Sequence, residues 1–174
     1  MLRILLTFTL IIGFGSFAMA QDTPPPAEET PVQKGKVKAE TEMTAKITKA
    51  ISSDSSTIGE DVNFILVKPV EGEGLTLPPG AELYARIVDV HKAEDADDLT
   101  KISIMFDFVQ AGEDFIPCKA LIIGVEQMGE QVKLEASETF EGGTVLTLKG
   151  KGLQINEGMV FKVKLIKDLD TENK

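Results

Sequence analysis

The chain has 174 residues, with 18 Lys and Arg against 28 Asp and Glu, so its formal net charge is −10. This acidic excess repels phosphate backbones and anionic lipid headgroups, and it argues against binding to nucleic acid or to a membrane surface. The single cysteine, Cys118, excludes an internal disulfide framework. With no Trp and one Tyr, the chain has little aromatic surface on which to stack sugars, and an aliphatic core must supply its stability.

The first twenty residues have the pattern of a secretory signal peptide. Arg3 supplies a positive start, residues 4–17 are mostly apolar, and Ala18-Met19-Ala20 has the small-x-small spacing that signal peptidase recognises. We therefore expect cleavage between Ala20 and Gln21 and export of the mature chain to the periplasm or beyond the cell. An uncleaved anchor is the alternative, although the apolar stretch is short for a membrane span.

Residues 21–35 combine proline with acidic and small polar residues, so they cannot bury apolar surface. This composition predicts a disordered linker between the signal peptide and the folded part. We expect a single β domain over residues 36–170, followed by a short tail at residues 171–174.

From Lys36 onward the apolar pattern is mostly that of strands. Apolar residues alternate over Glu60–Val70 and over Lys101–Phe108, and a polar turn separates the latter from the apolar run Phe115–Val125. These two runs predict a β-hairpin whose second strand, apolar on both faces, is central and doubly covered. Helical signal is weak and is strongest over Glu130–Glu138. The fold class expected is all-β: a small barrel or sandwich of about seven to nine mostly antiparallel strands.

A short strand pattern occurs three times, at Glu42–Ile47, Glu82–Ile87 and Val160–Leu165. A turn with glycine precedes the second and third copies, at Gly80 and Gly158, where glycine accepts a positive φ. Glu40 occupies the equivalent position before the first copy, so we expect that turn to be made differently or not at all. The repeat indicates architecture and not chemistry.

Groups that could carry catalysis are few. His91 is the only imidazole, and it is expected on the surface at a strand end; Cys118 lies in an apolar run and is expected to be a small buried hydrophobe. No nucleophile elbow, zinc-binding His pair or phosphate-binding glycine loop occurs. We predict no catalytic residue and no cofactor.

One acidic cluster offers a possible calcium site, with candidate ligands Glu94, Asp95, Asp97 and Asp98. The spacing of these carboxylates is not that of an EF-hand loop. The sequence favours a solvated hairpin tip, and we therefore predict no metal site, with calcium binding as the alternative.

Four segments occur in an order typical of one known family: Ser56–Val62, Leu75–Leu83, Ile102–Phe108 and Ile155–Leu169. This order resembles the C-terminal β-barrel domain of the TrbI-like channel components of bacterial conjugation and type IV secretion. The resemblance covers about residues 36–169 and implies a stand-alone, exported relative of that barrel. The segment Gln127–Gly143 is too short and too polar to be the paired apolar helices of channel members, so pore formation is not expected.

Two functions are consistent with these observations. The first is a non-enzymatic cell-envelope protein whose β domain is a structural or protein-interaction module, docking by strand addition at the early strand Glu42–Ile51. The second is a secreted ligand-binding or hydrolytic domain that uses carboxylates, with or without calcium. The partners expected are other envelope proteins, with no nucleic acid and no stable membrane span after cleavage. The sequence leaves the oligomeric state open.

Overall fold

The computed structural model describes residues 34–126, 132–150 and 152–172. The predicted signal peptide and most of the predicted linker lie outside these residues. The described part contains fifteen β-strands and no helix, and therefore no helix long and apolar enough to cross a membrane. The strands are β1 (Lys36–Val37), β2 (Glu42–Ile47), β3 (Ile51–Ser52), β4 (Asp61–Leu66), β5 (Val70–Glu71), β6 (Thr76–Leu77), β7 (Glu82–His91), β8 (Leu99–Ala111), β9 (Asp114–Pro117), β10 (Ala120–Val125), β11 (Val132–Ala136), β12 (Gly143–Lys149), β13 (Gln154–Ile155), β14 (Val160–Leu165) and β15 (Leu169–Asp170).

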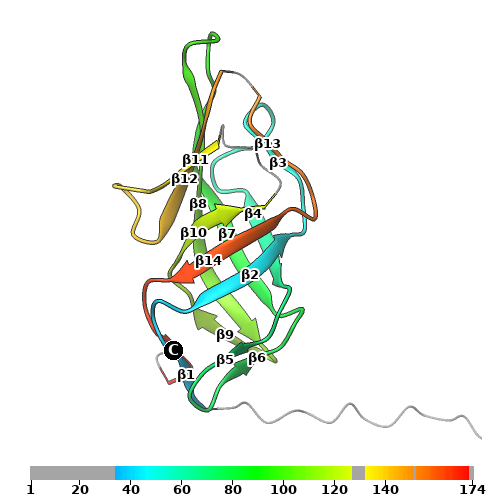
Figure 1. Cartoon of the computed structure of the whole chain (residues 1–174), viewed down its shortest axis with the longest axis vertical. Helices are drawn as coiled ribbons and strands as arrows, with labels where there is room; N and C mark the ends of the chain where they lie inside the picture. Colours follow the sequence, from blue (N-terminus) through cyan, green and yellow to red (C-terminus); the bar gives the residue numbers. More distant parts are fainter. Residues whose placement is uncertain (1–33, 127–131, 151, 173–174) are drawn as a thin grey trace, which may run out of the picture.

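The main sheet is antiparallel and nearly closed, which confirms the predicted all-β class and gives it the form of a barrel. Its order is β10-β14-β2-β4-β7-β8-β12-β11, with β9 also paired to β8. Figure 1 shows β10, β14 and β2 in front of β7 and β8. Because β9 pairs with β8 and β10 pairs with β14, the bent segment from β9 to β10 brings β10, at one end of the sheet, back to β8, while β12 and β11 continue beyond this point.

Two hydrogen bonds hold this seam. The Cys118 N–H, just after β9, donates to the carbonyl of Asp107 in β8 over 2.8 Å. Further along, the Ile122 N–H of β10 donates to the buried Thr144 Oγ1 of β12, also over 2.8 Å. A side-chain hydroxyl thus replaces the backbone carbonyl that a regular strand pair would supply, so this buried N–H is satisfied.

The alternation of apolar residues explains why these segments form a barrel. In β2, β4 and β14 every second residue is buried, and the side chains between them face solvent or are half-buried. Phe64, Phe106 and Phe161 meet inside, with ring centroids 5.2 Å apart for Phe64–Phe106 and 5.3 Å for Phe64–Phe161. Aliphatic side chains from every strand of the barrel fill the remaining interior.

Four turns of one design start the strands β2, β4, β7 and β14. The third residue of each turn has a positive φ, between 67° and 87°: Glu40, Gly59, Gly80 and Gly158. Its N–H donates over 2.8 Å to the carbonyl of a buried residue on another strand: Leu165, Ile87, Leu66 and Ile47, respectively. The N–H of the same buried residue donates to the backbone carbonyl of the fourth residue of the turn.

The turns dock in reciprocal pairs. The turn before β2 docks on Leu165 of β14, and the turn before β14 docks on Ile47 of β2. The turns before β4 and β7 are related in the same way, through Ile87 and Leu66. Each strand pair, β2–β14 and β4–β7, is therefore fixed at both ends.

Four details differ from the sequence-based expectation. Glu40 adopts the left-handed geometry itself, with φ 67°, so the first turn is made in the same way as the others. The strand β2 lies between β14 and β4 and has no open edge for strand addition. The run Phe115–Val125 bends into β9 and β10, and it leaves Phe115 51% exposed and Ile123 40% exposed. The segment Glu130–Glu138, where the helical signal is strongest, contains the strand β11 from Val132 to Ala136.

The turn geometry predicts the effect of adding a side chain at Gly80 or Gly158. No atom lies within 4 Å of a Cβ placed at either residue, so the substitution to Ala is penalised only by its positive φ. We expect each variant to lower the free energy of unfolding by about 1–2 kcal/mol in urea titrations. The matched control is Gly124→Ala, where φ is not positive and the new Cβ makes an ordinary 3.5 Å contact with Lys162. An equal loss of unfolding free energy in all three variants would contradict a penalty that comes from the positive φ.

Candidate interaction surfaces

The acidic cluster lies at the tip of the long β7–β8 hairpin, at the top of Figure 1. The Asp95 Oδ1 accepts the N–H groups of Asp97 and Asp98, over 2.9 Å and 3.0 Å. The Asp97 Oδ1 pairs with the Lys149 Nζ at 3.0 Å. These carboxylates therefore shape and close the turn, as expected of Asp in a polar turn.

Asp98 is similarly engaged. Its carboxylate accepts the N–H groups of Leu99 and Glu94, which lower the pKa of Asp98 below its ordinary value, and the His91 Nε2 lies 3.3 Å from its Oδ2. His91 is on the surface at the end of β7. Among the described residues, no three His, Cys, Asp or Glu side chains are grouped so that they could hold a metal ion. The prediction of no metal site stays a prediction, with calcium binding by Glu94, Asp95, Asp97 and Asp98 as its alternative.

Cys118 is fully buried in the barrel interior, between β9 and β10. Burial raises the pKa of its thiol to about 12, because the core does not solvate a thiolate. The thiol belongs to the hydrophobic core and offers no nucleophile to solvent.

A cluster of aromatic side chains on the outer face of the barrel is the first candidate surface. Tyr84 of β7, Phe108 of β8 and Phe115 of β9 form what we term the aromatic wall. Phe108 lies opposite Tyr84 in the sheet register, and the ring centroids of Tyr84 and Phe115 are 5.6 Å apart. Phe108 is 43% exposed and Phe115 is 51% exposed. Large aromatic rings left this open are typical of protein-binding surfaces.

Polar groups border the aromatic wall. The Tyr84 hydroxyl donates to the Gln110 Oε1 over 3.0 Å, and the neighbouring Glu82 carboxylate raises the pKa of Tyr84. Next to the aromatic wall, Arg86 of β7 and Asp107 of β8 form an ion pair at 3.3 Å. A shallow hollow of about 310 Å³ adjoins the patch, lined by Pro78, Pro79, Gly80, Ala81, Glu82, Gln110 and Gly112. An apolar centre, a polar rim and an adjacent hollow are the parts of a docking site.

A β-bulge explains why the aromatic wall was not predicted from the sequence. The alternation Ile102, Ile104, Phe106, Phe108 indicates one buried face. In the structure Tyr84 pairs with Phe108 and Ala85 pairs with Phe106, so Asp107 is an extra residue. The extra residue reverses the alternation, turning Phe108 outward and burying Val109. The polar Asp107 between two Phe residues is the one local sign of this bulge in the sequence.

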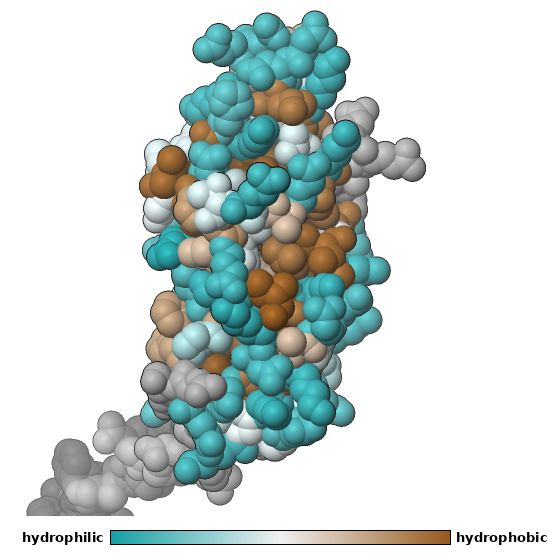
Figure 2. Space-filling model, turned by 90° about the vertical axis from the view of Figure 1, so that its left-hand side faces the viewer, coloured by the Kyte–Doolittle hydropathy of each residue, from teal (hydrophilic) through white to brown (hydrophobic). Residues whose placement is uncertain are grey.

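The open edge of β11 is the second candidate surface. In the described part of the chain, β11 has one hydrogen-bonded neighbour, β12, and it ends the sheet. Figure 1 shows β11 and β12 at the side of the barrel, and Figure 2 views the molecule from that side, where apolar side chains gather between hydrophilic ends. An unpaired strand edge is a template for another strand.

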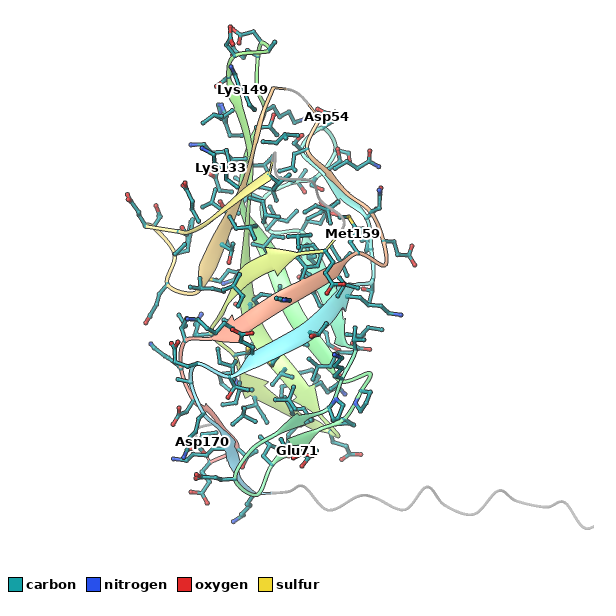
Figure 3. The ribbon with its side chains drawn as sticks, viewed as in Figure 1. Asp54, Glu71, Lys133, Lys149, Met159 and Asp170 are labelled. Atoms are coloured by element: carbon teal, nitrogen blue, oxygen red, sulfur yellow. The ribbon has the colours of Figure 1, made fainter. Side chains whose placement is uncertain are left out.

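The outward face of the β8–β12–β11 arm contains a hollow of about 430 Å³. Its lining includes three lysines, Lys101, Lys133 and Lys149, together with Glu135 and Glu138. Figure 3 labels Lys133 on β11 and Lys149 at the end of β12. The face is therefore charged with both signs, in contrast to the apolar aromatic wall.

Neither a family model nor a curated protein matches the sequence. Among solved structures, the chain is similar to ComB10 of the Com type IV secretion system of Helicobacter pylori, with a TM-score of 0.46 and 10% sequence identity over 78% of this chain and 90% of that chain. That protein belongs to a type IV secretion system, which is the kind of assembly that the sequence resemblance names. We base the functional proposal on this chain's own surfaces.

The burial of Cys118 predicts its reactivity. We expect the native protein to resist a thiol-specific reagent at about pH 9, where an ordinary cysteine is largely thiolate. After unfolding in urea the thiol should react fully, because its pKa then returns to the ordinary range. Rapid labelling of the native protein at the unfolded rate would show that Cys118 is accessible.

Proposed function

We propose that this chain is an exported, non-enzymatic protein of the bacterial cell envelope, and that its β domain binds another envelope protein through the aromatic wall. The observation that carries the proposal is the exposure of Phe108 and Phe115 beside Tyr84. Export is supported by the signal-peptide pattern before Gln21.

The energetics favour a protein partner for this surface. Covering the exposed halves of Phe108 and Phe115 would remove roughly 100 Å² each from water, worth about 2.5 kcal/mol per ring before the costs of association. Tyr84 adds a ring that packs against Phe115 at an interplanar angle of 60°, and its hydroxyl is already oriented by Gln110. Aromatic anchors with a polar rim are the residues that dominate binding energy in protein interfaces.

The other groups in the described residues support binding more than catalysis. His91 is on the surface, with Asp98 as its neighbour, and Cys118 is sealed in the core. A catalytic centre needs a nucleophile or base held beside a second functional group in a concave site. The lining of the hollow beside the aromatic wall includes two prolines and two glycines, which suit a peptide surface better than a reacting substrate.

Photo-cross-linking in the protein's own host tests this proposal. The tagged full chain, with a photoreactive phenylalanine analogue in place of Phe115, should cross-link to a defined envelope protein upon irradiation. We expect Phe108→Gln to reduce the cross-linked product at least roughly tenfold, as expected when a hot-spot residue is lost.

The control is Ile58→Gln, which removes an even more exposed apolar side chain (66% exposed) from the turn before β4, outside the aromatic wall. This variant should retain the cross-link, and melting curves of the purified variants should confirm that each is folded. Equal cross-linking in all three proteins, or no specific product, would refute the proposed docking surface.

A further inference from the structure

The orientation of the β11 backbone shows which of its groups face outward. The Ser137 N–H donates to the Gly143 carbonyl across the β11–β12 pair, over 2.8 Å. Antiparallel strands alternate between residues bonded to one neighbour and residues bonded to the other. The N–H and C=O groups of Val132, Leu134 and Ala136 therefore point away from β12, toward the open edge. Among the described residues, β12 is the only strand paired with β11, so these six groups face an edge that a second strand could occupy.

We propose that β11 pairs with β11 of a second copy of this chain, antiparallel and about a two-fold axis at Leu134. Leu134 would exchange both backbone hydrogen bonds with its symmetry mate, and Val132 would do so with Ala136 of the second copy. The two β8–β12–β11 arms would then form one continuous sheet across the dimer. An interface in which the same residues meet on both sides is the usual design of a two-fold dimer.

Charge complementarity selects both the occupant and the register. Centring the axis on Leu134 places Lys133 opposite Glu135 of the second copy, and the reverse pair follows by symmetry. Shifting the axis to Lys133 or Glu135 keeps the hydrogen-bond phase but sets Lys opposite Lys or Glu opposite Glu. Opposite charges directly across a strand pair stabilise it, and like charges destabilise it. Of these three registers, only the one at Leu134 pairs the charges favourably.

The side chains of β11 allow this approach. Val132 and Leu134 are half-buried against the core of their own domain, and Lys133 and Glu135 alternate with them on the outward face. Residues opposite each other in a strand pair lie on the same face, so the proposed register joins apolar to apolar and charged to charged. The contrary interpretation is that Lys133 protects the edge from pairing, as edge lysines often do.

Charge reversal distinguishes these interpretations. Sedimentation velocity of the full chain over a range of concentrations should show a reversible monomer–dimer equilibrium. Lys133→Glu creates two Glu–Glu pairs across the axis, and Glu135→Lys creates two Lys–Lys pairs. We expect each single variant to raise the dimer dissociation constant roughly tenfold or more. The double variant, Lys133→Glu with Glu135→Lys, restores both pairs and should dimerise as the unmodified chain does.

The control is Lys162→Glu, the same charge change at an exposed position on β14, which should leave the dimer intact. Amide hydrogen exchange gives a second measurement: Val132, Leu134 and Ala136 should become protected as the concentration rises. A chain that stays monomeric, or a double variant that does not recover dimerisation, would overturn the proposal. The outcome is independent of the aromatic wall, which lies on β7, β8 and β9.

Discussion

The reciprocal docking of four left-handed turns is the constraint on which the barrel depends. Each turn starts a strand and is fixed by a pair of backbone hydrogen bonds to a buried aliphatic residue on the partner strand. Because the turns before β2 and β14 fix each other's strands, and those before β4 and β7 do the same, register is specified at both ends of both pairs. A slip by one residue would break these bonds and turn every buried side chain outward. The register of these four neighbouring strands therefore follows from the turns.

Much of this design could be predicted from the sequence, because it depends on local signals. Alternating apolar residues marked β2, β4, β7 and β14, and glycine marked the positive φ before β7 and β14. The turn at Glu40 could not be predicted, since its geometry is imposed by hydrogen bonding to Leu165 against the preference of a non-glycine residue. The salt bridge from Glu40 to Lys164, at 2.8 Å, gives that side chain a place in the folded state.

The two candidate surfaces could not be predicted from the sequence, because both depend on how strands pair with their neighbours. The alternation over residues 101–108 alone puts Phe108 on the same face as Phe106, because one strand does not reveal the bulge at Asp107 that turns Phe108 outward. The residues of β11 include good helix formers, but pairing with β12 outweighs their weak local preference. Both surfaces depend on β8: residues 99–105 pair with β12, and residues 108–111 pair with β9. One long strand thus carries a charged arm at one end and an aromatic wall at the other.

The central claim is that this chain works by assembling with another protein. The most direct measurement is the mass of the tagged chain after gentle extraction from its own host, determined by sedimentation without cross-linking. Our account predicts an assembly heavier than two copies of the chain, containing a second protein in fixed proportion. A species no heavier than a monomer or a simple dimer, released without any other protein, would contradict it.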